Sequence, residues 1–137
     1  KLLTVIADEG RDNNAVYQDD ARNLLDALPD ESLEAVYLLY PDPWPKTRHH
    51  KRRFVSAENL AGIHRVLRPD GMFFLASDIA EYIDWSLVQL ARHGGFDWPV
   101  SSADDWRRPP PDWPGTRYEA KALAAGRKAS YLRFIKS

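Results

Sequence analysis

LEAVYLLYPDPWPKTRHHKRRF, residues 33–54, joins an apolar run to an acid between two prolines, a tryptophan and a dense run of basic side chains. The apolar part is rich in Val, Leu and Tyr and is bounded by PDES and PDPWP, which is typical of a strand buried on both faces. Pro41 ends the strand, because proline cannot donate to a strand ladder. The stretch therefore predicts a buried strand that presents Asp42 and Trp44 at its carboxyl end, followed by a local cluster of cations.

Helices and strands alternate on both sides of this stretch. Apolar residues recur at helical spacing after it, and Asp19 or Asp20 is placed to cap a helix before it. The sequence RPDG, residues 68–71, predicts a turn, and the proline- and tryptophan-rich segment 106–119 predicts a loop. The expected elements are the end of a helix up to about Glu9, a strand at 15–18, helices at 21–27, 52–67 and 79–95, and strands at 33–40, 71–78, 96–100 and 129–137.

This alternation predicts an α/β fold with a mostly parallel sheet and an antiparallel hairpin at one edge. Ligands of such sheets bind beyond the carboxyl ends of the strands. Asp20, Asp42 and Asp78 each follow a predicted strand. Each is also a common cap or turn residue, so it is the three together that favour a site.

Composition limits the class of protein. The chain has 137 residues, of which 44% are hydrophobic and 28% charged, as expected for one soluble globular domain. No apolar run approaches the roughly 20 residues of a membrane span, and the first residues turn acidic too early for a signal peptide, so we expect a cytoplasmic protein. There is no cysteine, and His49 and His50 have no third ligand at metal spacing, so we expect no metal. Because the net charge is −1, a nucleic acid would have to bind a local group of cations.

The Pro-Asp-Pro-Trp element and its basic run resemble the signature of the tRNA (guanine-N7-)-methyltransferases. Three further elements are similar to that family and occur in its order: QDDARNLL at 18–25, ASD at 76–78 and TRYEAK at 116–121. The resemblance implies a Rossmann-like fold that uses S-adenosylmethionine as cofactor. In that family the cofactor site begins with a glycine-rich turn and an acidic residue on earlier strands, and neither occurs in this sequence. We therefore expect the family's fold with its N-terminal strands missing.

The resemblance also implies roles for individual residues. Methyl transfer to N7 of a tRNA guanosine, in the variable loop, would need no general base, because N7 carries a lone pair and no proton. Asp42 would be catalytic, accepting hydrogen bonds from guanine and stabilising the positive charge on the ring, and it would lie near the cofactor with Asp20. The expected substrate-binding residues are Trp44, Lys46, Arg48, Lys51, Arg52, Arg53, Asp78, Thr116, Arg117, Tyr118 and Glu119.

Other interpretations stay open from the residues alone. The prolines fit a rigid turn with Trp44 packed in the core, and the cations fit a solvated helix start, although cations oppose the positive end of a helix dipole. A catalytically silent RNA-binding module and an amino-directed nucleic-acid methyltransferase are the alternative functions. We expect tRNA as the partner, no membrane, and a monomer or a weak homodimer that associates through an exposed sheet edge.

Overall fold

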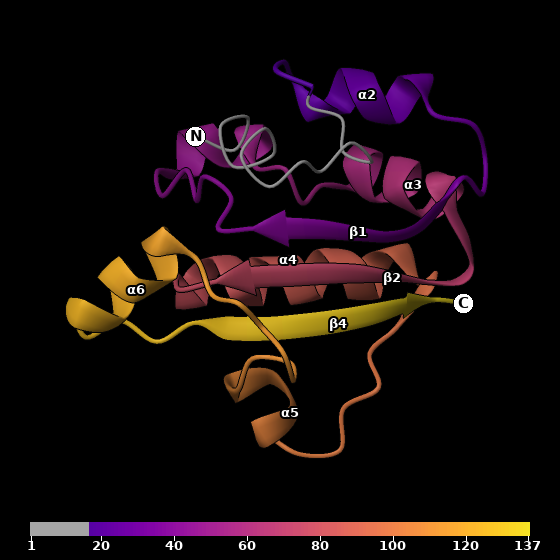
Figure 1. Ribbon diagram of the computed structural model, residues 1–137. Coiled ribbons are helices and arrows are strands. Elements are labelled where there is room, and N and C mark those ends of the chain that lie inside the picture. Colours follow the sequence, from indigo (N-terminus) through magenta and orange to yellow (C-terminus); the bar gives the residue numbers. More distant parts are fainter. Residues whose placement is uncertain (1–16) are drawn as a thin grey trace, which may run out of the picture.

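The computed structural model describes residues 17–137 and contains a four-stranded mixed sheet (Figure 1). Its strands are β1 (Leu33–Leu39), β2 (Leu67–Ser77), β4 (Ser130–Lys136) and β3 (Phe96–Asp97), in that spatial order. β1 and β2 are parallel, and β4 is antiparallel to both of its neighbours. Because β4 runs the opposite way, its first residue lies at the same edge of the sheet as the last residues of β1 and β2.

The predicted helix end up to Glu9 and the first half of the strand predicted at 15–18 lie outside the described residues. Tyr17 and Gln18, which are described, are not in a strand.

Three helices share a core with one face of the sheet. They are α2 (Ala21–Ala27), α3 (Ala57–Val66) and α4 (Ala80–His93). Leu25, Ile63 and Ile83, one from each helix, belong to the same buried cluster as Phe73 and Leu75 of β2. Burial of such side chains contributes about 1.5–3 kcal/mol each, so this cluster is the main source of stability.

The opposite face carries a smaller cluster. Phe74, Ala76 and Tyr131 are buried there, with Trp113 packed against them. Two short helices lie between β3 and β4: α5 (Asp104–Arg107), whose Trp106 packs against the large cluster, and α6 (Arg117–Ala124). Figure 1 shows α6 beyond the carboxyl end of β2, so this edge is covered by a late segment of the chain.

The helix predicted at 52–67 begins later than expected. The basic residues lie in the 3₁₀ helix η1 (Thr47–Arg52), and α3 begins only at Ala57. Ser56 caps it, since its hydroxyl accepts from the backbone N–H of Asn59 at 3.2 Å, and Glu58 lies in the first turn. The expected conflict between cations and the helix dipole therefore does not arise, because an acid occupies the real helix start.

The strand predicted at 33–40 is found, but the expectation that both its faces are buried is wrong. Tyr37 and Leu39 are 56% and 40% exposed. Val36 and Leu38 point to the other face and pack against the large core. β1 alternates because, within residues 17–137, helices cover only one of its faces.

The antiparallel pairing of the last two strands is confirmed, although β3 is only two residues long and pairs through Phe96 and Asp97. The connection between these strands is not the plain loop that was predicted, because it contains α5 and α6. The predicted turn at 68–71 lies inside β2, where Asp70 has a φ of +62° and the β1–β2 register shifts.

Candidate functional site

The carboxyl edge of the sheet brings together the segments that were predicted to carry function. The Pro-Asp-Pro-Trp segment follows β1, Asp78 follows β2, and α6 lies beside both (Figure 1). Tyr40 joins the first and last of these, because its ring lies 4.9 Å from the ring of Tyr118. Tyr118 in turn places its hydroxyl 3.4 Å from the carboxylate of Asp78.

The backbone around Asp42 has an unusual shape. Tyr40 and Trp44, on either side of Pro41-Asp42-Pro43, have φ angles of +51° and +42°. Such angles cost about 1–3 kcal/mol for residues with a side chain and persist only where other contacts hold them. One contact is the backbone N–H of Tyr40, which donates to the carbonyl of Ala76 at 2.8 Å. The turn leaves Asp42 exposed.

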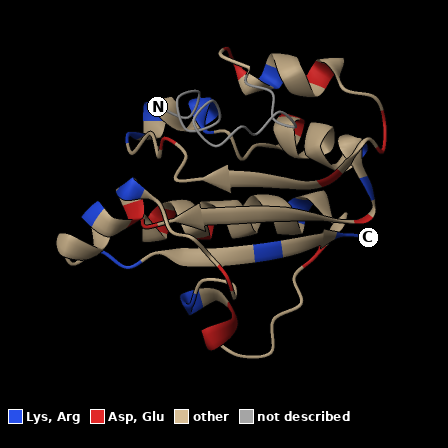
Figure 2. Ribbon diagram, viewed as in Figure 1, with Lys and Arg blue, Asp and Glu red and all other residues tan. Residues whose placement is uncertain are grey.

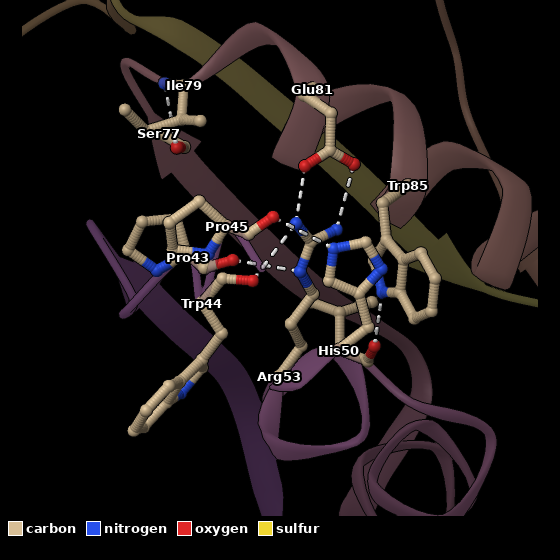
Figure 3. A network of polar contacts seen from close by, with 10 residues as sticks. Pro43, Trp44, Pro45, His50, Arg53, Ser77, Ile79, Glu81 and Trp85 are labelled. Atoms are coloured by element: carbon tan, nitrogen blue, oxygen red, sulfur yellow. Dashed lines mark hydrogen bonds and ion pairs between the residues drawn. The ribbon is translucent and has the colours of Figure 1, made fainter. Parts of the chain in front are cut away.

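Arg53, the last residue of the basic run, holds the other side of this turn (Figure 3). Its Nε donates to the carbonyl oxygen of Pro43 at 2.8 Å, and its Nη2 lies 3.5 Å from the carbonyl oxygen of Trp44. Both Nη atoms bind the carboxylate of Glu81 in the first turn of α4, with Nη1 at 2.9 Å from Oε2. A guanidinium fork suits this arrangement, because its donors point in fixed directions.

Aromatic rings enclose the Arg53 guanidinium. Its central carbon lies 4.9 Å from the ring centre of Trp85 and 5.4 Å from that of Tyr82. The Arg53 side chain has no exposed surface, whereas the side chain of Glu81 is 58% exposed. Hydrogen bonds from Arg53 lower the pKa of Glu81. The buried guanidinium is thus paired and anchors the turn to α4.

This placement corrects the expectation that Arg53 contacts the substrate. A phosphate cannot reach a guanidinium that is fully buried and already bound to a carboxylate and a backbone carbonyl. His50 also faces inward, with Nε2 at 3.4 Å from the carbonyl oxygen of Pro45 and its ring edge on Trp85.

The other cations of the run are exposed. Lys46, Arg48, Lys51 and Arg52 all lie at the surface of η1 or beside it. The guanidinium of Arg52 lies 5.0 Å above the ring of Trp44. Trp44 is half-buried, so it is neither a core residue nor a freely accessible stacking platform.

Asp78 is bound by residues that come later in the chain. Its side chain is only 2% exposed, and its Oδ2 accepts from Nε of Arg127 at 2.7 Å. This hydrogen bond raises the pKa of Arg127. The sequence gives Arg127 no specific role, because nothing in AGRKAS links it to a residue 49 positions earlier.

The TRYEAK element has a structural role in this arrangement. Thr116 caps α6, because its hydroxyl accepts from the N–H of Glu119 at 3.0 Å. The buried carboxylate of Glu119 accepts from the Tyr40 hydroxyl at 2.8 Å and from Trp113 Nε1 at 2.9 Å. Burial opposes ionisation of Glu119, but these hydrogen bonds outweigh burial and lower its pKa. Burial and the bond to Glu119 raise the pKa of Tyr40. Arg117 and Tyr118 are exposed beside this group.

Asp20 lies apart from this cluster. It is exposed and caps α2, with Oδ1 accepting from the N–H of Arg22 at 3.0 Å and from its Nε at 3.3 Å. In Figure 1 α2 runs against the direction of β1, so the end that carries Asp20 points toward the carboxyl end of β1.

The part of the chain that the structure describes contains neither a candidate metal site nor a candidate membrane span. Residues 17–137 contain no group of three or more His, Cys, Asp or Glu side chains that could hold a metal ion. None of the described helices is both long enough and apolar enough to cross a bilayer.

Similarity to a solved structure supports the fold. An S-adenosylmethionine-dependent methyltransferase from Mesorhizobium loti superposes with a TM-score of 0.51 at 16% identity, covering 99% of this chain and 76% of that one. At this identity the likeness concerns the fold alone, and it confirms the predicted Rossmann-like fold.

Sequence comparison identifies the family. Residues 1–132 match a family model described as "Putative methyltransferase". The tRNA (guanine-N(7)-)-methyltransferase of Agrobacterium fabrum is 56% identical over 99% of this chain, and that of Rhizobium johnstonii is 54% identical over the same share. The chain spans 59% and 58% of the length of these two relatives. The chain belongs to this methyltransferase family, whose curated members include the tRNA (guanine-N(7)-)-methyltransferases.

Proposed function

We propose that the protein containing this chain transfers a methyl group from S-adenosylmethionine to N7 of a guanosine in tRNA, in the variable loop. The observation that carries the proposal is the turn that presents an exposed Asp42 at the carboxyl edge, held by Arg53 and flanked by exposed cations. The names of its relatives favour this reaction.

The reaction requires little acid–base chemistry from the protein, because guanine N7 carries no proton that must be removed. S-adenosylmethionine supplies a methyl group on a positively charged sulfur. The lone pair on guanine N7 forms the new N–C bond while the S–CH₃ bond breaks and its electron pair returns to sulfur. The positive charge moves to the guanine ring, so a carboxylate near the ring stabilises the product side of the reaction.

Asp42 fits that requirement. Its two oxygens can accept hydrogen bonds from the N1 and exocyclic amine hydrogens of guanine, which no other standard base presents in that arrangement. The positive φ angles at Tyr40 and Trp44 fix the direction of the turn before the substrate binds, which lowers the cost of ordering it afterwards.

The cofactor's adenosine end would lie near Asp20. The cap contacts of Asp20 both use Oδ1, and the carboxylate is exposed, so Oδ2 fits a hydrogen-bond donor of the nucleoside. The nucleotide side of the site would be formed by Thr116, Arg117, Tyr118 and Asp78. Thr116 would contribute by capping α6, and Asp78 by holding Arg127.

Phosphates of the tRNA would bind the exposed cations Lys46, Arg48, Lys51 and Arg52. Their position beside the Asp42 turn is the expected one for a base drawn into the edge of the sheet while its backbone stays outside.

The test is a transfer assay with the full-length protein, labelled S-adenosylmethionine and an unmodified tRNA transcript, followed by mapping of the labelled atom. Label on guanine N7 is the expected result. Label on an exocyclic amine would establish the amino-directed alternative instead, and tRNA binding without any label would establish a silent RNA-binding module.

A further inference from the structure

A second group of cations lines a cavity at the β4 side of the carboxyl edge. The cavity has a volume of about 560 Å³. Its walls come from the end of α5 and from the residues that lead into β4. The lining residues are Trp106, Arg107, Arg108, Lys128, Ala129 and Ser130.

The fold brings these cations together from two segments about twenty residues apart in the sequence. Trp106 packs against the large core and so fixes the short helix α5. The Arg107 guanidinium lies 5.1 Å from the Trp106 ring centre, which orients it. In Figure 2 the blue of Lys and Arg appears both at the end of α5 and in the segment that leads into β4, on the same side of the molecule.

The charge of this cavity is one-sided. Three of its six lining residues are cationic and none is acidic. Asp104 supplies a counter-charge beside the cavity, with its carboxylate 3.9 Å from Arg108, and both side chains are well exposed. The single charge of Asp104 offsets only one of the three cations, so the cavity keeps an excess of positive charge in a chain whose net charge is −1.

The cavity adjoins the candidate site. Lys128 follows Arg127, whose guanidinium binds Asp78, and Ser130 lies opposite Ser77 in the β2–β4 register. Neighbouring strands are about 5 Å apart, so the end of β1 and the start of β4 are separated by about 10 Å. The cations of η1 follow β1, whereas Lys128 precedes β4, so the two groups of cations flank the end of β2, which Asp78 follows.

We propose that this cavity, through Arg107, Arg108 and Lys128, binds backbone phosphates of the RNA whose guanosine reaches Asp42. The cavity forms a second phosphate contact, separate from the cations of η1. It fixes the direction in which the RNA strand crosses the edge of the β-sheet. The inference rests on the proposed function for the identity of the RNA.

The test compares two charge-matched double variants of the full-length protein. Arg107→Gln/Arg108→Gln removes two cations from the cavity. Arg68→Gln/Arg92→Gln removes two exposed cations at the opposite edge, near the start of β2 and in the last turn of α4. Affinity for an unmodified tRNA transcript is measured by fluorescence anisotropy at several salt concentrations, with Lys128→Gln as a third variant.

The cavity variant should bind tRNA several-fold more weakly than the control variant at low salt. Each lost phosphate contact should reduce the slope of log affinity against log salt by about 0.7–0.9, so the double variant should lose about 1 to 2 from the slope. Thermal unfolding should be the same for both, because all four side chains are exposed. A salt slope equal to that of the control variant would overturn the proposal.

The outcomes separate this inference from the proposed function. If the unaltered protein binds tRNA without methylating it, the proposed function fails, yet the slope comparison still decides whether the cavity binds phosphate. If the unaltered protein methylates N7 and the slopes agree, only the cavity proposal fails.

Discussion

Arg53 and Glu81 form a two-point ion pair that ties the turn around Asp42 to the first turn of α4 (Figure 3). Because Arg53 also binds the carbonyl of Pro43, the carboxylate on α4 and the backbone beside Asp42 are held by one side chain. Arg53, a buried residue of the same motif, therefore positions Asp42, the exposed catalytic candidate.

Replacing Arg53 by lysine should destabilise the fold, because lysine keeps the charge but cannot bind Glu81 and two carbonyls together. We expect a loss of about 2–3 kcal/mol in the free energy of unfolding, measured by urea denaturation. The matched control is Arg52→Lys in the adjacent, exposed position, for which we expect a change within about 0.5 kcal/mol. Equal stability of the two variants would refute the anchoring role of Arg53.

The ion pair should also make stability depend on pH. Arg53 lowers the pKa of Glu81 in the folded protein, so the contribution is complete above the unfolded pKa of about 4.3 and is lost as pH falls through the lower folded value. The difference in Tm between the unaltered protein and Glu81→Gln should therefore be largest near neutral pH and shrink below pH 4. Asp84→Asn, exposed on the same helix, is the control. A Tm difference that stays constant from pH 7 to pH 3 would contradict the assignment.

Gly95 should tolerate no side chain. A Cβ there would lie 2.7 Å from the His93 ring and 2.8 Å from Nε2 of His64. Since both rings also pack against Phe96, they cannot move freely, and Gly95→Ala should lose about 1–3 kcal/mol.

Gly94→Ala provides the comparison for Gly95→Ala. Its added Cβ meets nothing within 4 Å, but its φ of +75° should cost about 1 kcal/mol. Thermal unfolding of both variants measures the difference, and a smaller effect at Gly95 than at Gly94 would argue against the packing of the two histidines.

Tyr40→Phe should weaken the junction between β1 and α6. It removes one of the hydrogen bonds to the buried Glu119 carboxylate, at a cost of about 1–2 kcal/mol. Tyr37→Phe, whose ring is 56% exposed, is the control and should be nearly neutral. Chemical denaturation decides this, and no difference between the variants would show that the Tyr40 hydroxyl does not stabilise α6.

Much of the architecture could be predicted because local signals agreed with the fold. The cap at Asp20, the apolar run of β2 and the glycine after α4 each marked an element correctly. The start of α3 was placed too early, because Phe54 and Val55 fit a helical spacing although they belong to the loop that Arg53 and Ser56 organise.

The roles of the individual residues in the basic run could not be predicted from the amino-acid sequence. Arg52 and Arg53 are chemically identical neighbours, yet one is exposed and the other is fully buried. The difference comes from Glu81, Tyr82 and Trp85, which are about thirty residues away in the sequence. The same holds for Arg127, whose partner Asp78 is set by the pairing of β4 with β2.

The most direct test of the central claim is single-turnover methyl transfer by full-length Asp42→Asn, at saturating tRNA and S-adenosylmethionine. Asparagine keeps the size of the side chain but removes the charge that we propose stabilises the methylated ring. We predict that transfer to guanine N7 slows by about 100-fold or more while thermal stability is unchanged, because Asp42 is exposed. Transfer at the unaltered rate would contradict the role given to Asp42 and to the turn that presents it.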